Sequence, residues 1–316
     1  MGAGSVKDGI ERVVAVDWSG DKGPGQRKKL WAGVWTAGTG RIQLESGRTR
    51  EELIGWLVER ARETPRMVVG VDCCFSFPAW FLEEHGCATA FEFWDKVAAG
   101  KGEEWLHREC EDARFWGVRG PGRSGKRPPE FCGPGLRRML RETDWENKIA
   151  QGLEGGDPER AAKMMGIQAK SPFQIGGSGS VGTGSLRAMP YLLRLREAGF
   201  RVWPFDSAAL GAKPRPLLVE MYTRLLTGAV KKSNPAARKE YLAVRKKTAG
   251  EEYDGIYARL PRGVLDKALG SEDAFDALVC CIEMVRWRAE FAGLKKTHDA
   301  LFRLEGITWR PGVANV

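Results

Sequence analysis

Two unbroken apolar runs, each ending at an aspartate, stand out in the pattern of hydrophobic and polar positions along this chain. Residues 13–16 lead into Asp17, and residues 67–71 lead into Asp72. Short, mainly β-branched runs without a polar break are typical of strands buried on both faces of a parallel or mixed sheet. Functional groups of such sheets gather at the carboxyl ends of the strands. If the two strands are neighbours, their aspartates lie side by side; the alternative is that each acid simply caps a loop.

Alternating and helical patterns predict how the chain continues from the first strand. Residues 30–36 and 41–45 have the pattern of two strands joined by a Gly-containing turn, so the sheet begins as three antiparallel strands. Thr49 and Glu52 form a capping box that opens a helix, and the strand at 67–71 follows. We therefore expect an α/β fold with a mixed sheet flanked by helices, in which parallel strands follow the three antiparallel ones.

The regular pattern is interrupted after Asp72, which divides the chain into three segments. We expect residues 1–72 to form the first half of a core, 73–170 a basic and aromatic insertion of helices and loops, and 171–316 the second half of the core with a C-terminal helix. In this second half the patterns predict a helix, two strands and a final helix, at residues 186–198, 200–205, 217–222 and 271–291 respectively. The strand at 217–222 also carries an acid, Glu220.

The final predicted helix has three further acids in its first two turns. Glu272 and Asp273 suit the positive end of the helix dipole, and for Glu272 we prefer that structural interpretation. Asp276 lies one turn further along and shares with Asp273 a face that continues into apolar positions. If this face packs on the central strands, Asp273 and Asp276 approach Asp17 and Asp72.

Carboxylates that converge without a basic partner repel one another, and they persist together where divalent cations neutralise them. Oxygen ligands of this kind suit Mg²⁺ or Mn²⁺. Two such ions about 4 Å apart can activate a water and stabilise the leaving oxygen in phosphodiester hydrolysis. This chemistry needs no Ser, His or Cys nucleophile, and the chain has only 3 histidines and no C-x-x-C pair among its 7 cysteines.

Composition narrows the class of partner and the compartment. A hydrophobic content of 42% over 316 residues is enough for a packed core. The net charge of +9 favours an anionic partner, most simply nucleic acid, although general solubility would also account for it. No apolar run approaches the roughly 18 residues of a membrane span, and the amino terminus lacks the order of a signal peptide, so we expect a cytoplasmic protein without a membrane partner. Nothing in the composition favours one oligomeric state.

Two tracts carry much of the positive charge. Residues 114–141 contain eight Lys or Arg against one acid, with Phe115, Trp116 and Phe131 interleaved. Such a tract either binds a nucleic-acid strand through phosphate contacts and base stacking or forms a solvated loop that packs its aromatic side chains inward. Residues 213–247 contain ten Lys or Arg against two acids.

Four segments of the chain resemble the signature segments of the domain of unknown function 429, a family predicted to be ribonuclease H-like nucleases. These segments are Val13-x-x-Val16-Asp17-Trp18-Ser19-Gly20, Gly70-Val71-Asp72, Val219-Glu220-Met221-Tyr222 and Asp273-x-x-Asp276-Ala277. The resemblance spans about residues 12–288 and does not extend to the central insertion. It implies a ribonuclease H-like mixed sheet and a metal-dependent nuclease that acts on DNA or RNA.

The resemblance also implies roles for individual acids. Asp17 would be the metal ligand of the first strand, Asp72 the acid of the fourth strand, and Asp276, with Asp273, the acids of the last helix. Asp72 stands where Holliday-junction resolvases carry Glu, so its side chain has a shorter reach. Glu220 matches an acid of the family but has no place in the nuclease scheme, and we keep it as a candidate catalytic residue.

Three other interpretations remain open. Residues 177–182 match G-x-G-x-x-G before a predicted helix, which suits a dinucleotide-binding loop, a loop that holds a substrate phosphate, or a plain flexible loop. Asp17 with the following Trp-Ser-Gly partly matches the strand-end turn of actin-like ATPases and sugar kinases, which are ATP-binding phosphotransferases. The basic composition also suits a non-catalytic nucleic-acid-binding protein.

Overall fold

The computed structural model describes residues 9–145, 167, 169–177, 179–248 and 255–313 of the chain. The chain divides into two compact units. We call the first the sheet unit; it comprises Met1–Asp72, Ala198–Lys296 and Trp309–Val316. We call the second the helical unit; it comprises Cys73–Glu197 and Thr297–Thr308. Each unit is described separately below.

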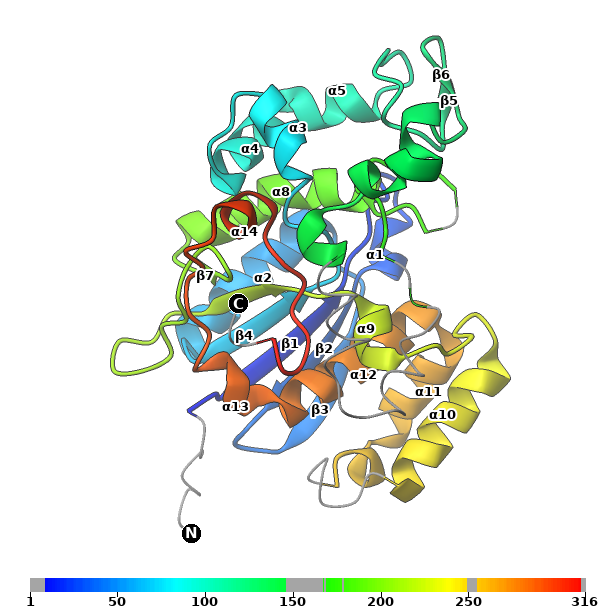
Figure 1. The fold of residues 1–316 in the computed structure, drawn as a ribbon. Coiled ribbons are helices and arrows are strands. Elements are labelled where there is room, and N and C mark those ends of the chain that lie inside the picture. The colour runs from blue at the N-terminus through cyan, green and yellow to red at the C-terminus, as the bar shows by residue number, and fades with distance from the viewer. Residues whose placement is uncertain (1–8, 146–166, 168, 178, 249–254, 314–316) are drawn as a thin grey trace. The chain divides into compact units, whose positions relative to one another are not determined.

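A mixed sheet of six strands forms the centre of the sheet unit, as expected for an α/β fold (Figure 1). Its order is β3-β2-β1-β4-β8-β7, with bounds Arg41–Glu45, Trp31–Thr36, Arg12–Asp17, Met67–Val71, Leu217–Glu220 and Arg201–Val202. β1, β2 and β3 pair antiparallel, whereas β4 pairs parallel with β1, and β8 parallel with β4 and with β7. The expectation of three antiparallel strands followed by parallel ones is therefore confirmed.

The two apolar runs form the innermost pair of strands. Every residue from Val13 to Val16 is fully buried, and Val68 and Val69 on β4 are fully buried too. Val16 pairs with Val71, and the Asp72 amide donates to the Val16 carbonyl over 3.0 Å. The parallel pairing that follows from burial on both faces thus brings the carboxyl ends of β1 and β4 together.

One long helix, α12 (Glu272–Arg286), packs on the face of the sheet that carries Gly33 and Gly70. A Cβ atom at Gly33 would lie 2.3 Å from the Ala277 carbonyl oxygen, and one at Gly70 would lie 2.7 Å from the Met284 sulfur. Every residue of α12 from Ala274 to Val285 is buried. The close contact between α12 and the strands therefore depends on the absence of side chains at these two glycines.

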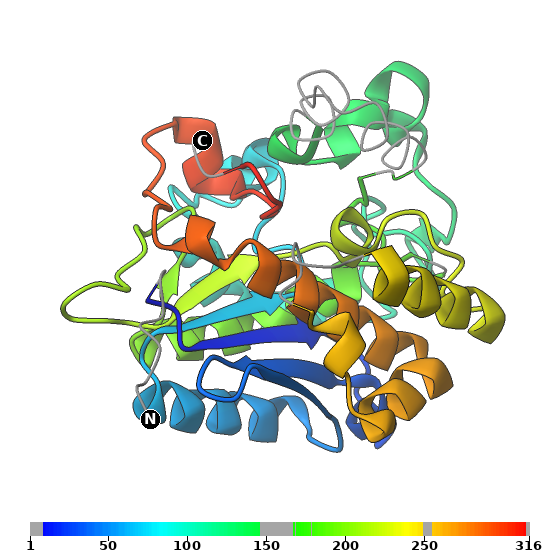
Figure 2. The ribbon, with the colours of Figure 1, turned by 90° about the horizontal axis from the view of Figure 1, so that it is seen from below.

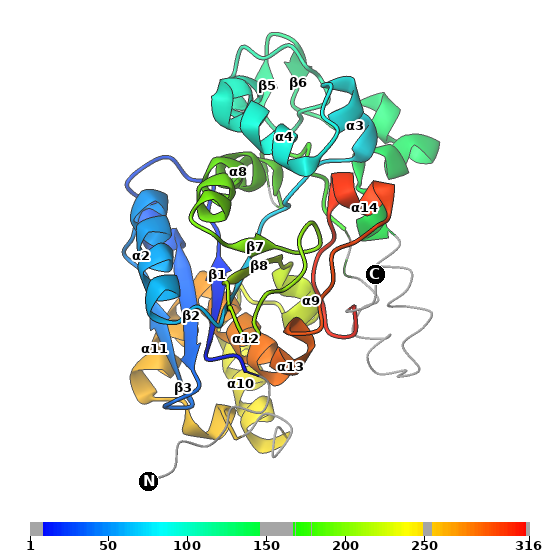
Figure 3. The ribbon, with the colours of Figure 1, turned by 90° about the vertical axis from the view of Figure 1, so that its left-hand side faces the viewer.

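Helix α2 (Arg50–Glu63) lies on the opposite side of the sheet from α12 (Figures 2 and 3). It opens with the predicted capping box, because Thr49 accepts from the Glu52 amide and Glu52 accepts from the Thr49 amide. Its apolar face, with Leu53, Ile54 and Leu57, is buried. The remaining helices of the sheet unit are α1 (Gln26–Lys29), α9 (Thr223–Thr227), α10 (Pro235–Thr248), a 3-10 turn (Tyr257–Arg259), α11 (Arg262–Gly270) and α13 (Arg288–Phe291).

Short helices around an aromatic core make up the helical unit. They are α3 (Ala79–Glu84), α4 (Ala90–Lys96), a π-helix (Val97–Lys101), α5 (Gly102–Leu106), the 3-10 helices Pro129–Phe131 and Gly133–Met139, α8 (Gly182–Glu197) and α14 (Ala300–Glu305), with a small hairpin of β5 (Arg119–Gly120) and β6 (Arg123–Ser124). The aromatic core includes Phe77, Phe81, Trp105 and Phe173, whose rings contact one another. These rings supply the buried apolar area that such short helices need for packing.

Three local expectations differ from the structure. Helix α8 belongs to the helical unit rather than to the sheet core. The strand expected at 200–205 spans only Arg201–Val202, because the chain turns after Val202 and the Asp206 amide donates to the Val202 carbonyl over 2.7 Å. Residues 172–175 form a turn and one isolated bridge, so no strand precedes the glycines of the G-x-G-x-x-G run as dinucleotide binding would require. Among the described residues, no helix is long and apolar enough to cross a membrane.

Candidate functional site

Asp17 and Asp72 lie next to each other at the carboxyl edge of the sheet. The register that pairs Val16 with Val71 places them on neighbouring strands, one residue further along. Side chains alternate between the faces of a strand, so Asp17 projects to the same face as Ala15, and Asp72 to the same face as Gly70. Ala15 pairs with Gly33 and with Gly70, the two glycines that contact α12. Both aspartates therefore face α12.

The amino-terminal turns of α12 bring two further aspartates to this edge. Ser271 caps the helix by accepting a hydrogen bond from the Ala274 amide, as the sequence predicts. Asp276, one turn into the helix, is 1% exposed, and Asp273 is half-buried. Glu272 is exposed, which agrees with the interpretation of this residue as a helix-end acid. The apolar face of α12 that packs on the sheet thus begins with Asp273 and Asp276.

Three of these acids, Asp17, Asp72 and Asp273, have raised pKa values. Burial raises the pKa of Asp17 well above its usual range, and the charges of Asp72 and Asp273 raise it further. Burial likewise raises the pKa of Asp72 to about 6, against the opposing effects of Lys232 and of a hydrogen bond from the Thr223 amide. The pKa of Asp273 is also raised, first by burial. We call Asp17, Asp72, Asp273 and Asp276 the carboxylate cluster.

One lysine lies within this cluster. Lys232, in the loop between α9 and α10, forms an ion pair with Asp276. Its charge also lowers the pKa values of Asp17, Asp72 and Asp273. Sequence reasoning missed this role, because Lys232 was one of ten basic residues between positions 213 and 247 and no local pattern distinguishes it.

The cluster offers carboxylate oxygens of the kind that a divalent cation binds. Asp276 Oδ1 is buried and has no hydrogen-bond partner in the part of the chain that the structure describes. A buried, unpaired carboxylate oxygen is costly unless a cation or a donor reaches it. Among the described residues, however, no group of three or more His, Cys, Asp or Glu side chains is arranged so that it could hold a metal ion. The residue types and their excess negative charge nevertheless fit Mg²⁺ or Mn²⁺.

Glu220 lies near the cluster in the sequence of strands, but its side chain is on the opposite face of the sheet. It pairs with Val71, so the alternation of side chains places it on the face opposite to Asp72. It is 2% exposed, and its charge contributes to the raised pKa of Asp72. Its carbonyl oxygen accepts a hydrogen bond from the Trp309 amide over 2.8 Å. Glu220 therefore lies on the face opposite to the one where the four aspartates gather, and its charge raises the pKa of Asp72.

A buried arginine holds the loop that follows Asp17. Arg50, the first residue of α2, is 7% exposed and donates to the carbonyls of Ser19, over 2.9 Å, and Asp21. The amide of Asp21 binds the Ser19 hydroxyl, and the amide of Gly23 binds the Asp21 carboxylate. These two amides are therefore used within the loop, whereas a phosphate-binding turn would present free amides to the ligand. The capping-box pattern predicts that a helix begins at Arg50, but it does not predict the hydrogen bonds from Arg50 to the loop after Asp17.

Part of the basic tract 114–141 is neutralised within the helical unit, while others of its basic residues, such as Arg119 and Lys126, are exposed. Arg114 pairs with Asp112 and Glu84 at 2.7 and 2.6 Å. Arg123 donates to the Trp105 carbonyl, and the fully buried Arg141 pairs with an acid three residues on. The aromatic side chains follow the same pattern, since those at positions 115 and 131 are 0% and 1% exposed. Inward packing is therefore observed for Phe115 and Phe131, whose rings are not available for base stacking, whereas Trp116 is half-buried with the Arg127 guanidinium over its ring.

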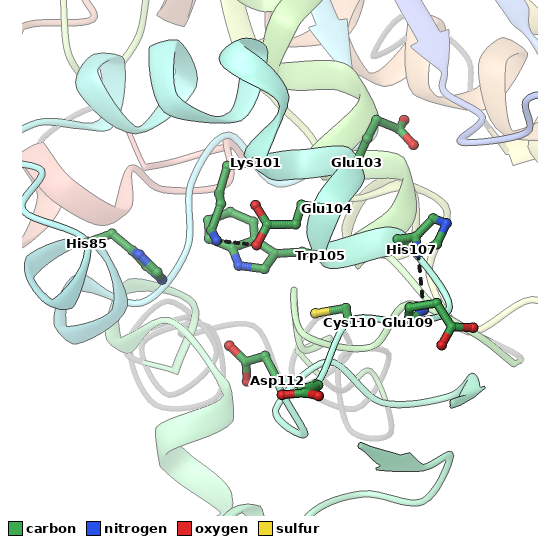
Figure 4. A pocket seen from close by; sticks show the side chains of 10 residues that line it. His85, Lys101, Glu103, Glu104, Trp105, His107, Glu109, Cys110 and Asp112 are labelled. Carbon is green, nitrogen blue, oxygen red and sulfur yellow. Dashed lines mark hydrogen bonds and ion pairs between the residues drawn. The ribbon is translucent and has the colours of Figure 1, made fainter. Parts of the chain in front are cut away.

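A cavity of about 720 Å³ lies in the helical unit (Figure 4). It is lined by Glu103, Glu104, Glu109, Glu111 and Asp112, with Lys101, His85, His107, Trp105 and Cys110. Three of these carboxylates have basic partners, since Glu104 pairs with Lys101, Glu103 with Arg187 and Asp112 with Arg114. The negative charge of the cavity is therefore partly neutralised.

Comparisons with known proteins identify no relative of this chain. The chain matches no family model, no curated protein sequence and no solved structure. The candidate site therefore depends on its own geometry, in which the carboxyl ends of β1 and β4 and the first turns of α12 bring four aspartates and one lysine together.

Proposed function

We propose that this protein is a metal-dependent phosphodiesterase that cleaves DNA or RNA, with a ribonuclease H-like core of the kind implied by its resemblance to the domain of unknown function 429. The carboxylate cluster is the observation that carries the proposal. Its four aspartates come from the two central parallel strands and from α12, which are the elements where the resemblance expects metal ligands. Three antiparallel strands, a crossover helix and a parallel strand beside β1 agree with the expected core.

The chain itself performs three tasks in this scheme. Asp17 and Asp72, on the rigid central strands, would hold the divalent cation, which would supply activation of a water and neutralisation of charge on the phosphate. Asp273 approaches from α12 as a further oxygen donor, and Asp276 holds Lys232 at the cluster. Burial by α12 lowers the local dielectric constant, which strengthens every interaction between these carboxylates and a cation.

The sheet unit also offers exposed positive charge for a polyanion. Lys239, Lys246 and Lys247 are exposed on α10, and Lys231 is exposed on the loop that carries Lys232. Lys239 and Lys246 are seven residues apart and therefore share one face of the helix. We propose that these lysines contact phosphates of the nucleic acid, because they are exposed and lie in the unit that carries the carboxylate cluster.

The test is a cleavage assay on labelled single-stranded, duplex, RNA–DNA hybrid and four-way-junction substrates with Mg²⁺, Mn²⁺ or EDTA. Cleavage should require the metal and should fall by about 100-fold or more in Asp17→Asn, because loss of a metal ligand costs at least as much as loss of its outer-shell partners. Asp266→Asn, on the exposed side of α11, removes a carboxylate outside the cluster and should retain full activity.

Other outcomes would favour the alternatives. Binding of the substrates without cleavage under any metal would indicate a non-catalytic nucleic-acid-binding protein. ATP binding would indicate a phosphotransferase of the actin-like or sugar-kinase type, which we consider less suitable because the loop after Asp17 uses the amides of Asp21 and Gly23 internally.

A further inference from the structure

The position of Lys232 at the cluster is built into the fold. Arg238, which is 4% exposed, donates to the carbonyl of Lys232 and to that of Leu269, just before α12 begins. The amide of Lys232 binds the Val230 carbonyl over 2.9 Å, and Arg224 donates to the same carbonyl over 2.9 Å. A buried arginine thus ties the lysine-bearing loop to the segment that carries the aspartates of α12.

The partners of Lys232 show where its charge acts. Its ammonium group pairs with Asp276, whose side chain is 1% exposed, while 26% of the Lys232 side chain remains exposed. The same charge acts on Asp17, Asp72 and Asp273. The ammonium therefore already provides positive charge among the carboxylates, at the end of the cluster formed by α12.

We propose that Lys232 takes the place of one of the two metal ions expected from the sequence, so that the carboxylate cluster binds a single divalent cation. This inference rests on the proposed function, because it assumes that the cluster binds a metal. Asp17 and Asp72, on the adjacent strand ends, hold that cation, and Lys232 on Asp276 supplies the second positive charge.

Two physical arguments support a single cation. In two-metal sites the ions lie about 4 Å apart, and carboxylates that bridge them offset their repulsion. Here Asp276 is occupied by an ammonium group, so a second ion would lose this ligand. A second ion would also lie close to a fixed positive charge in a buried site, where repulsion is poorly screened. A lysine charge also stabilises negative charge that develops on a phosphate, so the substitution preserves an electrostatic role.

The test counts Mn²⁺ ions bound to the full-length protein by isothermal titration calorimetry, and it uses electron paramagnetic resonance to detect exchange-coupled Mn²⁺ pairs. The wild type should bind one ion and show an uncoupled signal. Lys232→Ala and Lys232→Gln free Asp276 and should bind two ions with a coupled signal. Lys232→Arg keeps the charge and should bind one ion, as should the control Lys231→Ala, which removes the exposed neighbour on the same loop.

Each other result has a defined meaning. Two ions in the wild type, or one ion in both folded neutral variants, would overturn the single-cation inference and leave a metal-dependent nuclease intact. No ion in the wild type, together with no cleavage, would overturn the proposed function itself. Circular dichroism checks that each variant is folded. Two neutral variants, Lys232→Ala and Lys232→Gln, are used so that the test can still be made if one of them does not fold.

Discussion

Asp72 shows at the residue scale what crowding does to a carboxylate. Its side chain follows a central strand, faces α12 and shares its surroundings with Asp17. Burial raises the pKa of Asp72 from the ordinary 3.8 to about 6. The folded chain therefore binds this proton more tightly than the unfolded chain does.

The first prediction concerns the pH dependence of stability without metal. Because Asp72 has a pKa of about 6 when folded and an ordinary value of 3.8, the free energy of unfolding should fall as the pH rises between these values. The loss amounts to at most about 3 kcal/mol, since one pKa unit corresponds to about 1.4 kcal/mol. Asp72→Asn should remove this part of the slope and be more stable than the wild type at pH 7 in EDTA, as measured by urea unfolding between pH 4 and 8.

The control for this measurement is Asp266→Asn, whose carboxylate is 68% exposed and pairs only weakly with Arg262 at 3.9 Å. It should keep the slope of the wild type. A wild-type slope that Asp72→Asn leaves unchanged would contradict the assignment of this destabilisation to Asp72. Adding Mg²⁺ to the wild type should raise its stability at pH 7, because binding to the folded chain alone shifts the equilibrium.

At the element scale, the contact between α12 and the sheet decides whether the site exists. Two of its four aspartates are on strands and two on the helix, so their separation depends on how closely α12 approaches β1 and β2. That approach is permitted by Gly33, which pairs with Ala15 and lies under the Ala277 carbonyl. The glycine has no side chain, yet it determines the distance between the aspartates on the strands and those on α12.

The second prediction follows from this close contact. In Gly33→Ala the new methyl group would lie 2.3 Å from the Ala277 carbonyl oxygen, so α12 must move away from the sheet. We expect a loss of about 1–3 kcal/mol of stability, typical of overpacking, and weaker Mn²⁺ binding. Thermal unfolding and calorimetry measure both quantities.

Gly38→Ala is the matched control, because a Cβ at Gly38 would have no atom within 4 Å. It should leave stability and Mn²⁺ binding near wild-type values. If Gly33→Ala lost stability but bound Mn²⁺ as tightly as the wild type, the dependence of the site on the position of α12 would be wrong.

On the scale of the whole molecule, the net charge of +9 has a different meaning in the two units. In the helical unit, arginines such as Arg114 and Arg141 are paired with acids or buried. In the sheet unit, which carries the carboxylate cluster, α10 exposes Lys239 and Lys246. Total charge predicts a polyanionic partner, and we propose that the exposed lysines of α10 form part of its contact surface.

The third prediction tests this distribution in the cleavage-deficient Asp17→Asn background. Replacing Lys239 and Lys246 by Ala should weaken nucleic-acid binding, and it should reduce the dependence of log affinity on log salt concentration by about 2, close to one for each lost phosphate contact. Fluorescence anisotropy at several salt concentrations measures this slope.

Lys213→Ala is the control, since Lys213 is an exposed lysine that precedes β8 and therefore lies toward the amino ends of the parallel strands, away from the cluster. Its substitution should leave the slope unchanged. An equal effect of Lys213→Ala would show that binding follows overall charge and not a surface on α10.

Local sequence determined much of the framework. The apolar runs that end at Asp17 and Asp72 predicted β1 and β4, because burial on both faces demands an unbroken apolar strand. The capping box at Thr49 and the cap at Ser271 predicted where α2 and α12 begin, because each cap satisfies amides within a few residues of itself. The spacing of Asp273 and Asp276 likewise follows from the turn of the helix.

Only the tertiary structure decided which of these elements meet. The adjacency of β1 and β4, the opposite face of Glu220 and the inward packing of Phe115 depend on the pairing of distant segments. Lys232 lies 44 residues before Asp276, and no local pattern connects them. The sequence by itself thus determined where strands and helices begin and which acids they carry, since those features depend on neighbours in the chain. The site, with its lysine, was decided by the tertiary structure, because long-range packing sets the distances between charges.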